Sequence, residues 1–324
     1  MPKPPPKVDL ILAPTPLHRL DRVSQDLGLD LWIKRDDLSG FALGGNKGRK
    51  LEYLMADAIA QQAQVVVSCG SAQSNFIRQL GAACTRFGMT CAAAVMDLPY
   101  EGEPAAGEHL EPLGGNVLLD EILGVDLRFH PDAPWEELYA HAEELAQEHE
   151  RAGLRVYRIP VGGSSPLGAY AFYQAAQEVN AGPFDLVVTS SSSGSTHTGL
   201  AYGFAGTHTR VLGISADPEP GLTSEFALIA QGLDDLAGRG VRLRPDDFEL
   251  SLDYVGPGYG LTSAAADDAA RYLARREGIF LDPIYSGKAF AGLLDLARKG
   301  ELSGRVLFWH TGGVPSLFAR RIST

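Results

Sequence analysis

The sequence lacks most features of a secreted, membrane-bound or metal-binding protein. Its 324 residues include three cysteines, Cys69, Cys84 and Cys91, which form no CxxC pair. Such cysteines are typical of small core residues in a reducing compartment. No apolar run reaches the roughly 18 residues of a membrane span. Eight histidines show no metal-ligand spacing, and the HExxH pattern is missing. We therefore expect a cytoplasmic protein without a metal site.

Positive charge is also scarce. The chain has 28 lysines and arginines against 40 aspartates and glutamates, a net charge of −12. This balance argues against nucleic acids or anionic membranes as partners. The N-terminal segment MPKPPPKVDL has four prolines among its first six residues and no apolar core. It predicts a loose arm and not a secretion signal.

Strand-like and helix-like segments alternate along the chain, and hydrophobic residues make up a globular 45%. Short apolar strands between helices predict an α/β fold with mostly parallel sheets buried on both faces. The length favours two domains. The expected strands are 31–38, 65–69, 90–96, 125–130, 155–160, 185–190, 210–216 and 305–310. The expected helices are 48–62, 74–87, 104–111, 134–152, 166–181 and 196–206.

Two glycine-rich segments fail the nucleotide-binding patterns that they resemble. GPGYG at 256–260 does not satisfy GxGxxG and follows no clear strand. In GFALGGNK at 40–47, Asn46 stands where a Walker loop has lysine, and no serine or threonine follows Lys47. Neither segment supports a nucleotide site.

The segment GGNKGRK at 44–50 brings three cations, Lys47, Arg49 and Lys50, to a predicted helix N-terminus. That end of a helix is already partly positive, so the cations need an anion nearby. A lysine crowded by other cations has a lowered pKa and becomes a usable amine nucleophile. Two of only seven lysines fall here. The alternative is a solvated basic turn.

Two further polar turns follow buried strands. SSSSGSTHTG at 190–199 offers hydroxyl and backbone donors to a phosphate at a helix N-terminus. Its alternative is a flexible linker, which should not lie between a buried strand and a packed helix. CGSAQSN at 69–75 gathers Ser71, Gln73, Ser74 and Asn75 where a carboxylate can dock. Its alternative is ordinary helix capping by Ser71 or Ser74.

The segments LDPIYSGKAF (281–290) and WHTGGVPSLF (309–318) complete a set of five polar turns. In open α/β folds, ligands bind at this edge of a sheet. A phosphate site together with an activated lysine indicates a phosphate-bearing aldehyde held as a Schiff base. Pyridoxal phosphate is the common cofactor of that description.

Together these motifs resemble a known family. KRDDLSGFALGGNKGRKLEYL, CGSAQSNFIRQLGAA, SSGSTHTGL, DPIYSGKA and WHTGGVPSLF are similar, in order and spacing, to the fold-type-II pyridoxal-phosphate enzymes. The group is that of D-cysteine desulfhydrase and 1-aminocyclopropane-1-carboxylate deaminase, and the resemblance runs from about Leu10 to Ala319. It implies two open, mostly parallel sheets flanked by helices. A small domain, 49–160, would be inserted into a large one formed by 1–48 and 161–324.

The resemblance also implies roles for individual residues. Lys47 matches the Schiff-base lysine, Asn75 the asparagine beside the pyridine hydroxyl, and Ser74 the serine near the substrate α-carbon. Tyr259 and Tyr285 match two active-site tyrosines. The positions around the cofactor phosphate are Lys50, Ser193, Gly194, Ser195 and Thr196. The residues expected to bind substrate are Ser71, Gln73, Ser74, Asn75 and Phe76.

Two positions divide the group. Deaminases that open the cyclopropane ring carry an acid after the tyrosine of DPxY and a leucine after the histidine of the last motif. Here Ser286 and Thr311 stand at these positions, as in the desulfhydrases. A carboxylate at the pyridine nitrogen keeps it protonated and the ring strongly electron-withdrawing, whereas a hydroxyl leaves the ring neutral. Elimination tolerates a neutral ring because the negative charge that forms at the α-carbon is removed at once by departure of the thiolate.

The resemblance predicts a lyase that converts D-cysteine, or a related β-substituted amino acid, to pyruvate, ammonia and hydrogen sulfide. Either Lys47 or Ser74 would take the α-proton, and Tyr285 or Tyr259 would assist the leaving sulfur. The alternatives are a 1-aminocyclopropane-1-carboxylate deaminase, a lyase that releases sulfite from cysteate, and a non-catalytic carrier of amino acids or pyridoxal phosphate.

Phe76 departs from the family pattern, because histidine or glutamine is common after the Ser–Asn pair. It predicts broader tolerance of β-substituents, or a preference for less polar ones, since apolar surfaces discriminate less sharply than hydrogen bonds. The resemblance further implies a homodimer.

Overall fold

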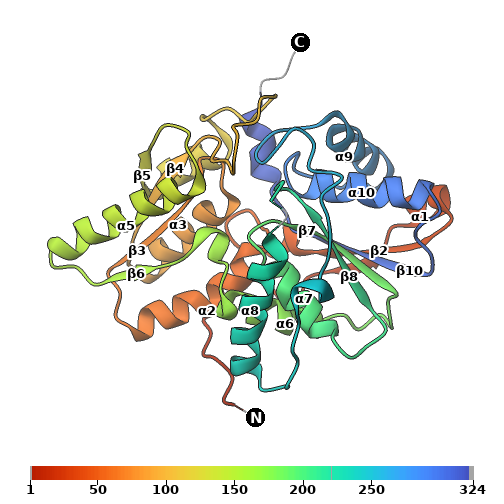
Figure 1. Cartoon of the computed structure of the whole chain (residues 1–324), viewed down its shortest axis with the longest axis horizontal. Coiled ribbons are helices and arrows are strands. Elements are labelled where there is room, and N and C mark those ends of the chain that lie inside the picture. Colours follow the sequence, from red (N-terminus) through yellow and green to blue (C-terminus); the bar gives the residue numbers. More distant parts are fainter. Residues whose placement is uncertain (1, 220, 321–324) are drawn as a thin grey trace.

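The computed structural model describes residues 2–219 and 221–320, which build two sheets flanked by helices (Figure 1). The six-stranded sheet has the order β1-β2-β10-β7-β8-β9, and only β1 is antiparallel to its neighbour. Its strands are β1 (Leu17–Arg19), β2 (Asp30–Arg35), β7 (Leu186–Ser191), β8 (Arg210–Ser215), β9 (Glu249–Ser251) and β10 (Arg305–His310).

The second sheet is four-stranded and entirely parallel, in the order β5-β4-β3-β6. Its strands are β3 (Val65–Ser71), β4 (Thr90–Met96), β5 (Asp126–Phe129) and β6 (Val156–Arg158). All four lie inside the segment 49–160, while the larger sheet takes strands from both sides of it. The α/β fold with two open, mostly parallel sheets is thus confirmed. The domain boundaries at 48/49 and 160/161 stay a prediction.

Ten helices surround the sheets of the described chain. They are α1 (Asp21–Leu27), α2 (Lys47–Ala60), α3 (Asn75–Phe87), α4 (Gly115–Leu123), α5 (Trp135–Arg151), α6 (Pro166–Ala176), α7 (Ser195–Phe204), α8 (Leu222–Ala237), α9 (Ala264–Glu277) and α10 (Ser286–Arg298). Figure 1 shows α2 and α6 beneath the junction of the two sheets. No helix of the described part is long and apolar enough to cross a membrane.

Alternation along the central strands of the larger sheet divides its core between two faces. In β10, Val306 and Phe308 pack into one cluster, with α1, α9 and α10, while Leu307 and Trp309 pack into another, with α6, α7 and α8. Because both faces are covered, the strand is apolar at nearly every position, as the sequence pattern indicates. Because β2, β7 and β10 run parallel to one another, their carboxyl ends meet at one edge of the sheet.

The helix expected at 104–111 is wrong. This segment is mostly exposed, and its backbone groups bond to distant segments instead of to the next helical turn. The carbonyl of Glu108 accepts the amide N–H of Thr262 (2.8 Å), and the N–H of Glu111 donates to the carbonyl of Ala319 (2.7 Å). The helix of this region, α4, begins only after Gly114, whose φ of 75° few other residues adopt.

The N-terminal arm is less loose than expected. The N–H of Val8 donates to the carbonyl of Glu52 (2.8 Å), and the N–H of Leu10 donates to its carboxylate (3.1 Å). Lys7 forms an ion pair with the same carboxylate, 3.0 Å away. The second half of the arm is therefore fastened to α2.

Candidate active site

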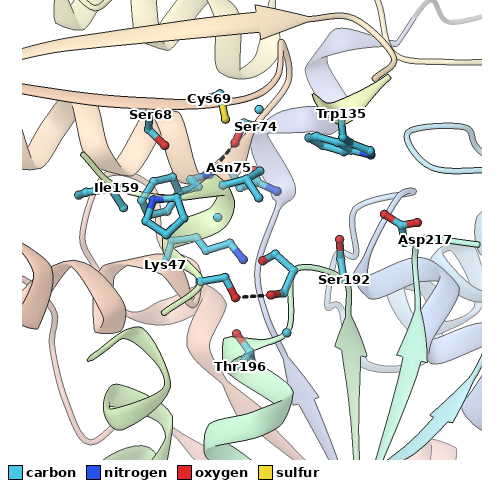
Figure 2. A pocket seen from close by; sticks show the side chains of 18 of the residues that line it. Lys47, Ser68, Cys69, Ser74, Asn75, Trp135, Ile159, Ser192, Thr196 and Asp217 are labelled. Atoms are coloured by element: carbon cyan, nitrogen blue, oxygen red, sulfur yellow. Dashed lines mark hydrogen bonds between the residues drawn. The ribbon is translucent and has the colours of Figure 1, made fainter. Parts of the chain in front are cut away.

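The polar turns named from the sequence surround one cavity of about 820 Å³ between the two sheets. The larger sheet contributes the loops after β2, β7, β8 and β10. The smaller sheet contributes β3 and the start of α3, and α5 closes one side. Figure 2 shows Lys47, Ser74, Asn75 and Thr196 directed toward this space. The ends of parallel strands are where α/β folds bind small molecules.

Lys47, the first residue of α2, lies in this cavity beside Lys50. Burial lowers the pKa of Lys47 to about 8. Burial and the neighbouring charge of Lys47 hold the pKa of Lys50 well below its usual range. The Lys50 ammonium donates to the carbonyl of Gly162 (3.0 Å). A lysine amine with a pKa near 8 is partly neutral at physiological pH and can act as a nucleophile.

Arg49, the third cation of the turn, does not belong to the cavity, which corrects the expectation of three cations around one anion. Its guanidinium is buried and bonds to both oxygens of Asp36 (2.9 and 2.8 Å) and to both oxygens of Glu178 (2.6 and 2.9 Å). Lys34 also contacts Glu178, at 2.6 Å. The charge of Arg49 is thus neutralised within the protein.

The serine-rich loop after β7 leads directly into α7. Ser193, Gly194 and Thr196 line the cavity, whereas Ser195 does not. Gly194 has a φ of 100°, and a Cβ there would lie 2.3 Å from the ring of Phe226, so only glycine fits. Asn46 donates from its side chain to the Thr196 hydroxyl (3.1 Å), which joins the start of α7 to the start of α2.

Ser195 is buried, and its hydroxyl has no partner among the described residues. Its backbone N–H donates to the Ser164 hydroxyl (3.0 Å). Ser195 therefore connects this loop to Ser164 behind the cavity lining. Its contact with a phosphate stays a prediction.

Ser74 and Asn75 line the cavity at the N-terminus of α3. The Ser74 hydroxyl accepts the backbone N–H groups of Phe76 (3.2 Å) and Ile77 (3.3 Å). The side-chain carbonyl of Asn75 accepts from the Asn116 amide (3.0 Å). Ser74 is thus a helix cap and a cavity residue at once.

Ser71 and Gln73 do not line this cavity. They lie beside an adjoining space of about 20 Å³ that Asn75 and Tyr285 share. The Gln73 amide donates to the carbonyls of Glu111 (2.8 Å) and Gly114 (3.2 Å), so it holds the loop before α4. The predicted substrate contacts of Ser71 and Gln73 therefore have no direct geometric support and stay predictions.

Phe76 is a core residue as well as part of the wall. Its side chain is 1% exposed and packs in the apolar core of the smaller sheet and its neighbouring helices. A Cβ added at Gly163 would lie 2.7 Å from its ring. Histidine at this position would place a polar ring in an apolar core.

Tyr259 and Tyr285 face each other with their hydroxyl oxygens 2.8 Å apart. Burial raises the pKa of both hydroxyls, and the neighbouring Tyr259 raises that of Tyr285 further. Both therefore stay protonated at neutral pH. Lys288 supports the Tyr259 loop, because its buried ammonium donates to the carbonyl of Gly258 (2.9 Å).

Ser286 and Thr311 occupy different settings. Thr311 lines the cavity, with its hydroxyl 3.0 Å from that of Ser190. Ser286 does not line it. Its buried hydroxyl donates to the carboxylate of Asp282, a cavity residue. The predicted contact of Ser286 with the cofactor ring stays a prediction.

Asp282 is a residue that the sequence reasoning missed, although it stands inside the quoted segment DPIYSGKA. Its carboxylate accepts the backbone N–H groups of Ile284 (2.9 Å), Tyr285 (2.7 Å) and Ser286 (2.8 Å). An Asp–Pro pair before a helix is a recognisable capping signal. Trp135 and Tyr139 were also missed, because only α5 brings them to the cavity.

Comparisons with known proteins agree with the site. Residues 8–312 match the family described as pyridoxal-phosphate dependent enzyme. A 1-aminocyclopropane-1-carboxylate deaminase of Methylobacterium nodulans is 40% identical over 323 residues, which cover 95% of this chain and 94% of the relative. A D-cysteine desulfhydrase of Salmonella choleraesuis is 38% identical over 326 residues, with 97% and 96% covered.

Solved structures show the same relationship. The crystal structure of an ACC deaminase homologue superposes with a TM-score of 0.87 at 38% identity and covers 97% of this chain and 93% of that one. O-ureido-L-serine synthase, at 20% identity and a TM-score of 0.62, shares the fold.

The cavity has the chemistry that pyridoxal phosphate needs. Lys47 provides an amine of lowered pKa, and Lys50 a second buried cation without an ion-pair partner among the described residues. The N-terminus of α7 adds backbone N–H groups suited to a phosphate. This chain belongs to the pyridoxal-phosphate-dependent enzymes, in the group of 1-aminocyclopropane-1-carboxylate deaminase and D-cysteine desulfhydrase.

Proposed function

We propose that this enzyme is a β-eliminating lyase that converts D-cysteine, or a close β-substituted amino acid, to pyruvate, ammonia and hydrogen sulfide. The observation that carries the proposal is that hydroxyls occupy both positions that divide the group. Thr311 lines the cavity with its hydroxyl 3.0 Å from that of Ser190, and the Ser286 hydroxyl is buried against the Asp282 carboxylate. The nearby Asp282 carboxylate is engaged by three N–H groups and the Ser286 hydroxyl.

Pyridoxal phosphate bound through Lys47 would supply an electron sink for the substrate α-carbon. A neutral ring would suit elimination, because the electrons of the broken Cα–H bond form the Cα–Cβ double bond as the β-substituent leaves with the pair of its own bond. Lys50, Ser193, Gly194 and Thr196 would hold the phosphate, and Asn75 would contact the pyridine hydroxyl. The ends of α3 and α7 both point donors at this space.

Lys47 is the better candidate for the α-proton base. With a pKa of about 8, its amine is close to the strength that suits a base at neutral pH. The Ser74 hydroxyl accepts two backbone N–H groups at a helix N-terminus, and this setting weakens its basicity. Ser74 then orients the substrate carboxylate.

Tyr285 and Tyr259 share one hydrogen bond, and their raised pKa values keep both protonated. Either hydroxyl can donate to the departing sulfur while it accepts the hydrogen bond that the other donates within the pair. This arrangement supports the tyrosine pair as the proton donor to the leaving group.

The alternative activity is ring opening of 1-aminocyclopropane-1-carboxylate, and the name of the Methylobacterium relative favours it. Purified protein is incubated with D-cysteine, L-cysteine, β-chloro-D-alanine, cysteate and 1-aminocyclopropane-1-carboxylate. Pyruvate from the D-amino acids supports the proposal, and 2-oxobutanoate in excess supports the alternative. Lys47→Ala is the control and should form neither product. If no substrate yields pyruvate, elimination is refuted.

We also propose a homodimer, as the resemblance implies. Four exposed apolar side chains lie on α4 or near it: Leu118 and Ile122 on the helix, Leu113 before it, and Phe318 in the 3₁₀-helical segment Val314–Ala319 that contacts it. Exposed apolar side chains that gather in one region are typical of subunit contacts. Light scattering at micromolar concentration measures the mass directly, and a monomer would refute this proposal without touching the chemistry. The cytoplasmic location stays a prediction.

A further inference from the structure

One side of the cavity carries carboxylates without counter-ions. Among the described residues, six lining carboxylates form no ion pair. Asp282 accepts three backbone N–H groups, and the other five are Glu101, Glu136, Asp217, Glu219 and Glu225. They come from α5, α8 and the loops after β4 and β8. We call these five residues the acidic wall. Arg158 also lines the cavity, but it is neutralised by Glu143 (2.8 Å) and Glu150 (2.6 Å).

The members of the acidic wall are close enough to act on one another. Burial raises the pKa of Glu219, and the charges of Glu225, Asp217, Glu101 and Glu136 raise it further. Burial raises the pKa of Asp217 as well, with Glu101 and Glu225 adding to the effect. Asp217 is buried, Glu219 is half-buried and the other three carboxylates are exposed, so together they give this side of the cavity a negative potential.

Asp217 gives the wall a group that needs a partner. The residue is only 6% exposed, and Figure 2 shows its carboxylate directed into the cavity on the side of Ser192 and Trp135. Its Oδ1 accepts the N–H of Glu219 (3.2 Å), and its Oδ2 accepts no hydrogen bond from the described residues. Lys288 is near enough to lower its pKa but does not pair with it. A largely buried carboxylate that faces a cavity is stabilised by a donor or cation that meets it there.

Aromatic rings stand beside the carboxylates. Trp135 lies 6.1 Å from Tyr139 and 5.2 Å from Tyr259, measured between ring centroids, and all three line the cavity. The faces of such rings attract cations. Two independent features, unpaired carboxylates and aromatic faces, therefore favour the same kind of ligand.

We propose that the acidic wall selects substrates by the charge of the β-substituent, and that it favours amino acids with a cationic one, such as a β-ammonium group, over those with a sulfonate or carboxylate. This inference rests on the proposed elimination and narrows its substrate class. It disfavours the cysteate activity considered from the sequence.

The chemistry of such a substrate balances. With 2,3-diaminopropionate the Cα–H bond breaks and its proton goes to Lys47. The Cβ–N bond then breaks, and the β-ammonium group leaves as ammonia with the bonding electron pair. The released 2-aminoacrylate takes up one water and yields pyruvate and a second ammonia. A carboxylate neighbour keeps the amine protonated, and the protonated amine is the form that can leave.

The test compares charge pairs in the holoenzyme. Initial rates of pyruvate release are measured with D-2,3-diaminopropionate, with neutral β-chloro-D-alanine and with D-cysteate. Calorimetric binding of D-2,4-diaminobutyrate and D-glutamate, which have no β-leaving group, adds a readout independent of turnover. The variants are Asp217→Asn and the double variant D217N/E219Q. Asp235→Asn is the matched control, because this exposed residue lies near the far end of α8 and forms no ion pair.

Each carboxylate of the wall should change the affinity for a singly charged ligand on the order of threefold, in opposite directions for cations and anions. The cation-to-anion ratio should then fall about tenfold in Asp217→Asn and further in the double variant, while Asp235→Asn leaves it unchanged. Added salt should lower the wild-type ratio.

The two proposals fail separately. The first outcome is that β-chloro-D-alanine reacts, but both variants keep the wild-type ratio of kcat/KM for diaminopropionate to that for cysteate and the wild-type ratio of affinities for diaminobutyrate and glutamate. The charge selection is then refuted and elimination stands. A wild-type preference for cysteate over diaminopropionate also refutes it. If no β-substituted substrate reacts while diaminobutyrate still binds more tightly than glutamate, elimination fails and the charge selection stands.

Discussion

Asp282 connects the stability of the site to its chemistry, and Asp282→Asn tests both. The residue is 1% exposed, and its carboxylate caps α10 by accepting the N–H groups of Tyr285 (2.7 Å) and Ser286 (2.8 Å). It packs against Gly313, where an added Cβ would lie 2.7 Å away. Asparagine keeps the shape but replaces one acceptor oxygen by an NH₂ group, so the Ser286 N–H loses its acceptor.

The cost follows from these contacts. A buried N–H left unsatisfied costs about 1–3 kcal/mol, and loss of a negative charge at a helix N-terminus costs about 0.3–1 kcal/mol more. We expect the free energy of unfolding to fall by about 1.3–4 kcal/mol. With an unfolding entropy of about 0.7 kcal/mol/K for a chain of this length, the melting temperature should fall by about 2–6 °C.

The same substitution should change the pKa of Lys47. Burial lowers this pKa to about 8, and the negative charge of Asp282 opposes the shift. Without that charge the pKa falls, so the neutral amine is available at lower pH. The assay is the rate at which the apoenzyme captures pyridoxal phosphate as a function of pH. The midpoint should move from near 8 to a value lower by up to about one pH unit.

Ser286→Ala is the control for charge, because it leaves the Asp282 carboxylate in place. It removes a hydroxyl that donates to this carboxylate and accepts the Asp282 N–H (2.9 Å). Its melting temperature should fall by about 1–4 °C, but the midpoint of capture should stay near 8. The reasoning is refuted if Asp282→Asn melts within 1 °C of the wild type, or if its midpoint stays where it was or rises.

Three further substitutions test other contacts. Arg49→Met should lower the free energy of unfolding by about 3–5 kcal/mol, because it leaves the buried Asp36 carboxylate without its cation and Glu178 with Lys34 alone. Burial raises the pKa of Glu178, but Arg49 and Lys34 outweigh this and the net pKa is lowered. The wild type should therefore lose stability as pH falls below about 4.5. Urea unfolding measures the free energy of unfolding at pH 7 and at pH 4, and its decrease between them should be smaller in Arg49→Met than in the wild type. Equal decreases in the two proteins would contradict the argument. Phe76→His should cost about 2–4 kcal/mol in the same assay, whereas unchanged stability would mean that the ring is not part of the core. Tyr259→Phe should lower kcat on D-cysteine at least about tenfold with little change in KM, and an unchanged kcat would exclude Tyr259 as the proton donor.

Much of the fold could be predicted from the sequence, because periodicity and local capping are local properties. The buried strands at 65–69, 90–96 and 305–310 are apolar at nearly every position, and the structure has β3, β4 and β10 there. Ser74 precedes α3 as a cap, and the resemblance named the family correctly. The helix expected at 104–111 is wrong because the backbone of this segment bonds to residues more than 100 positions away, and no local sequence pattern indicates such bonds.

For the candidate site, too, one part could be predicted from the sequence and another part depended on the tertiary structure. The sequence by itself determined the chemical groups, a lysine and polar turns at strand ends, because each motif is continuous in the chain. The tertiary structure alone decided which of them meet. It removed Arg49 from the site by pairing it with Glu178, 129 positions away. It also gathered Glu101, Glu136 and Asp217 onto one wall. Charges act through space, so residues that have no relation along the chain decide which anions and cations the cavity accepts.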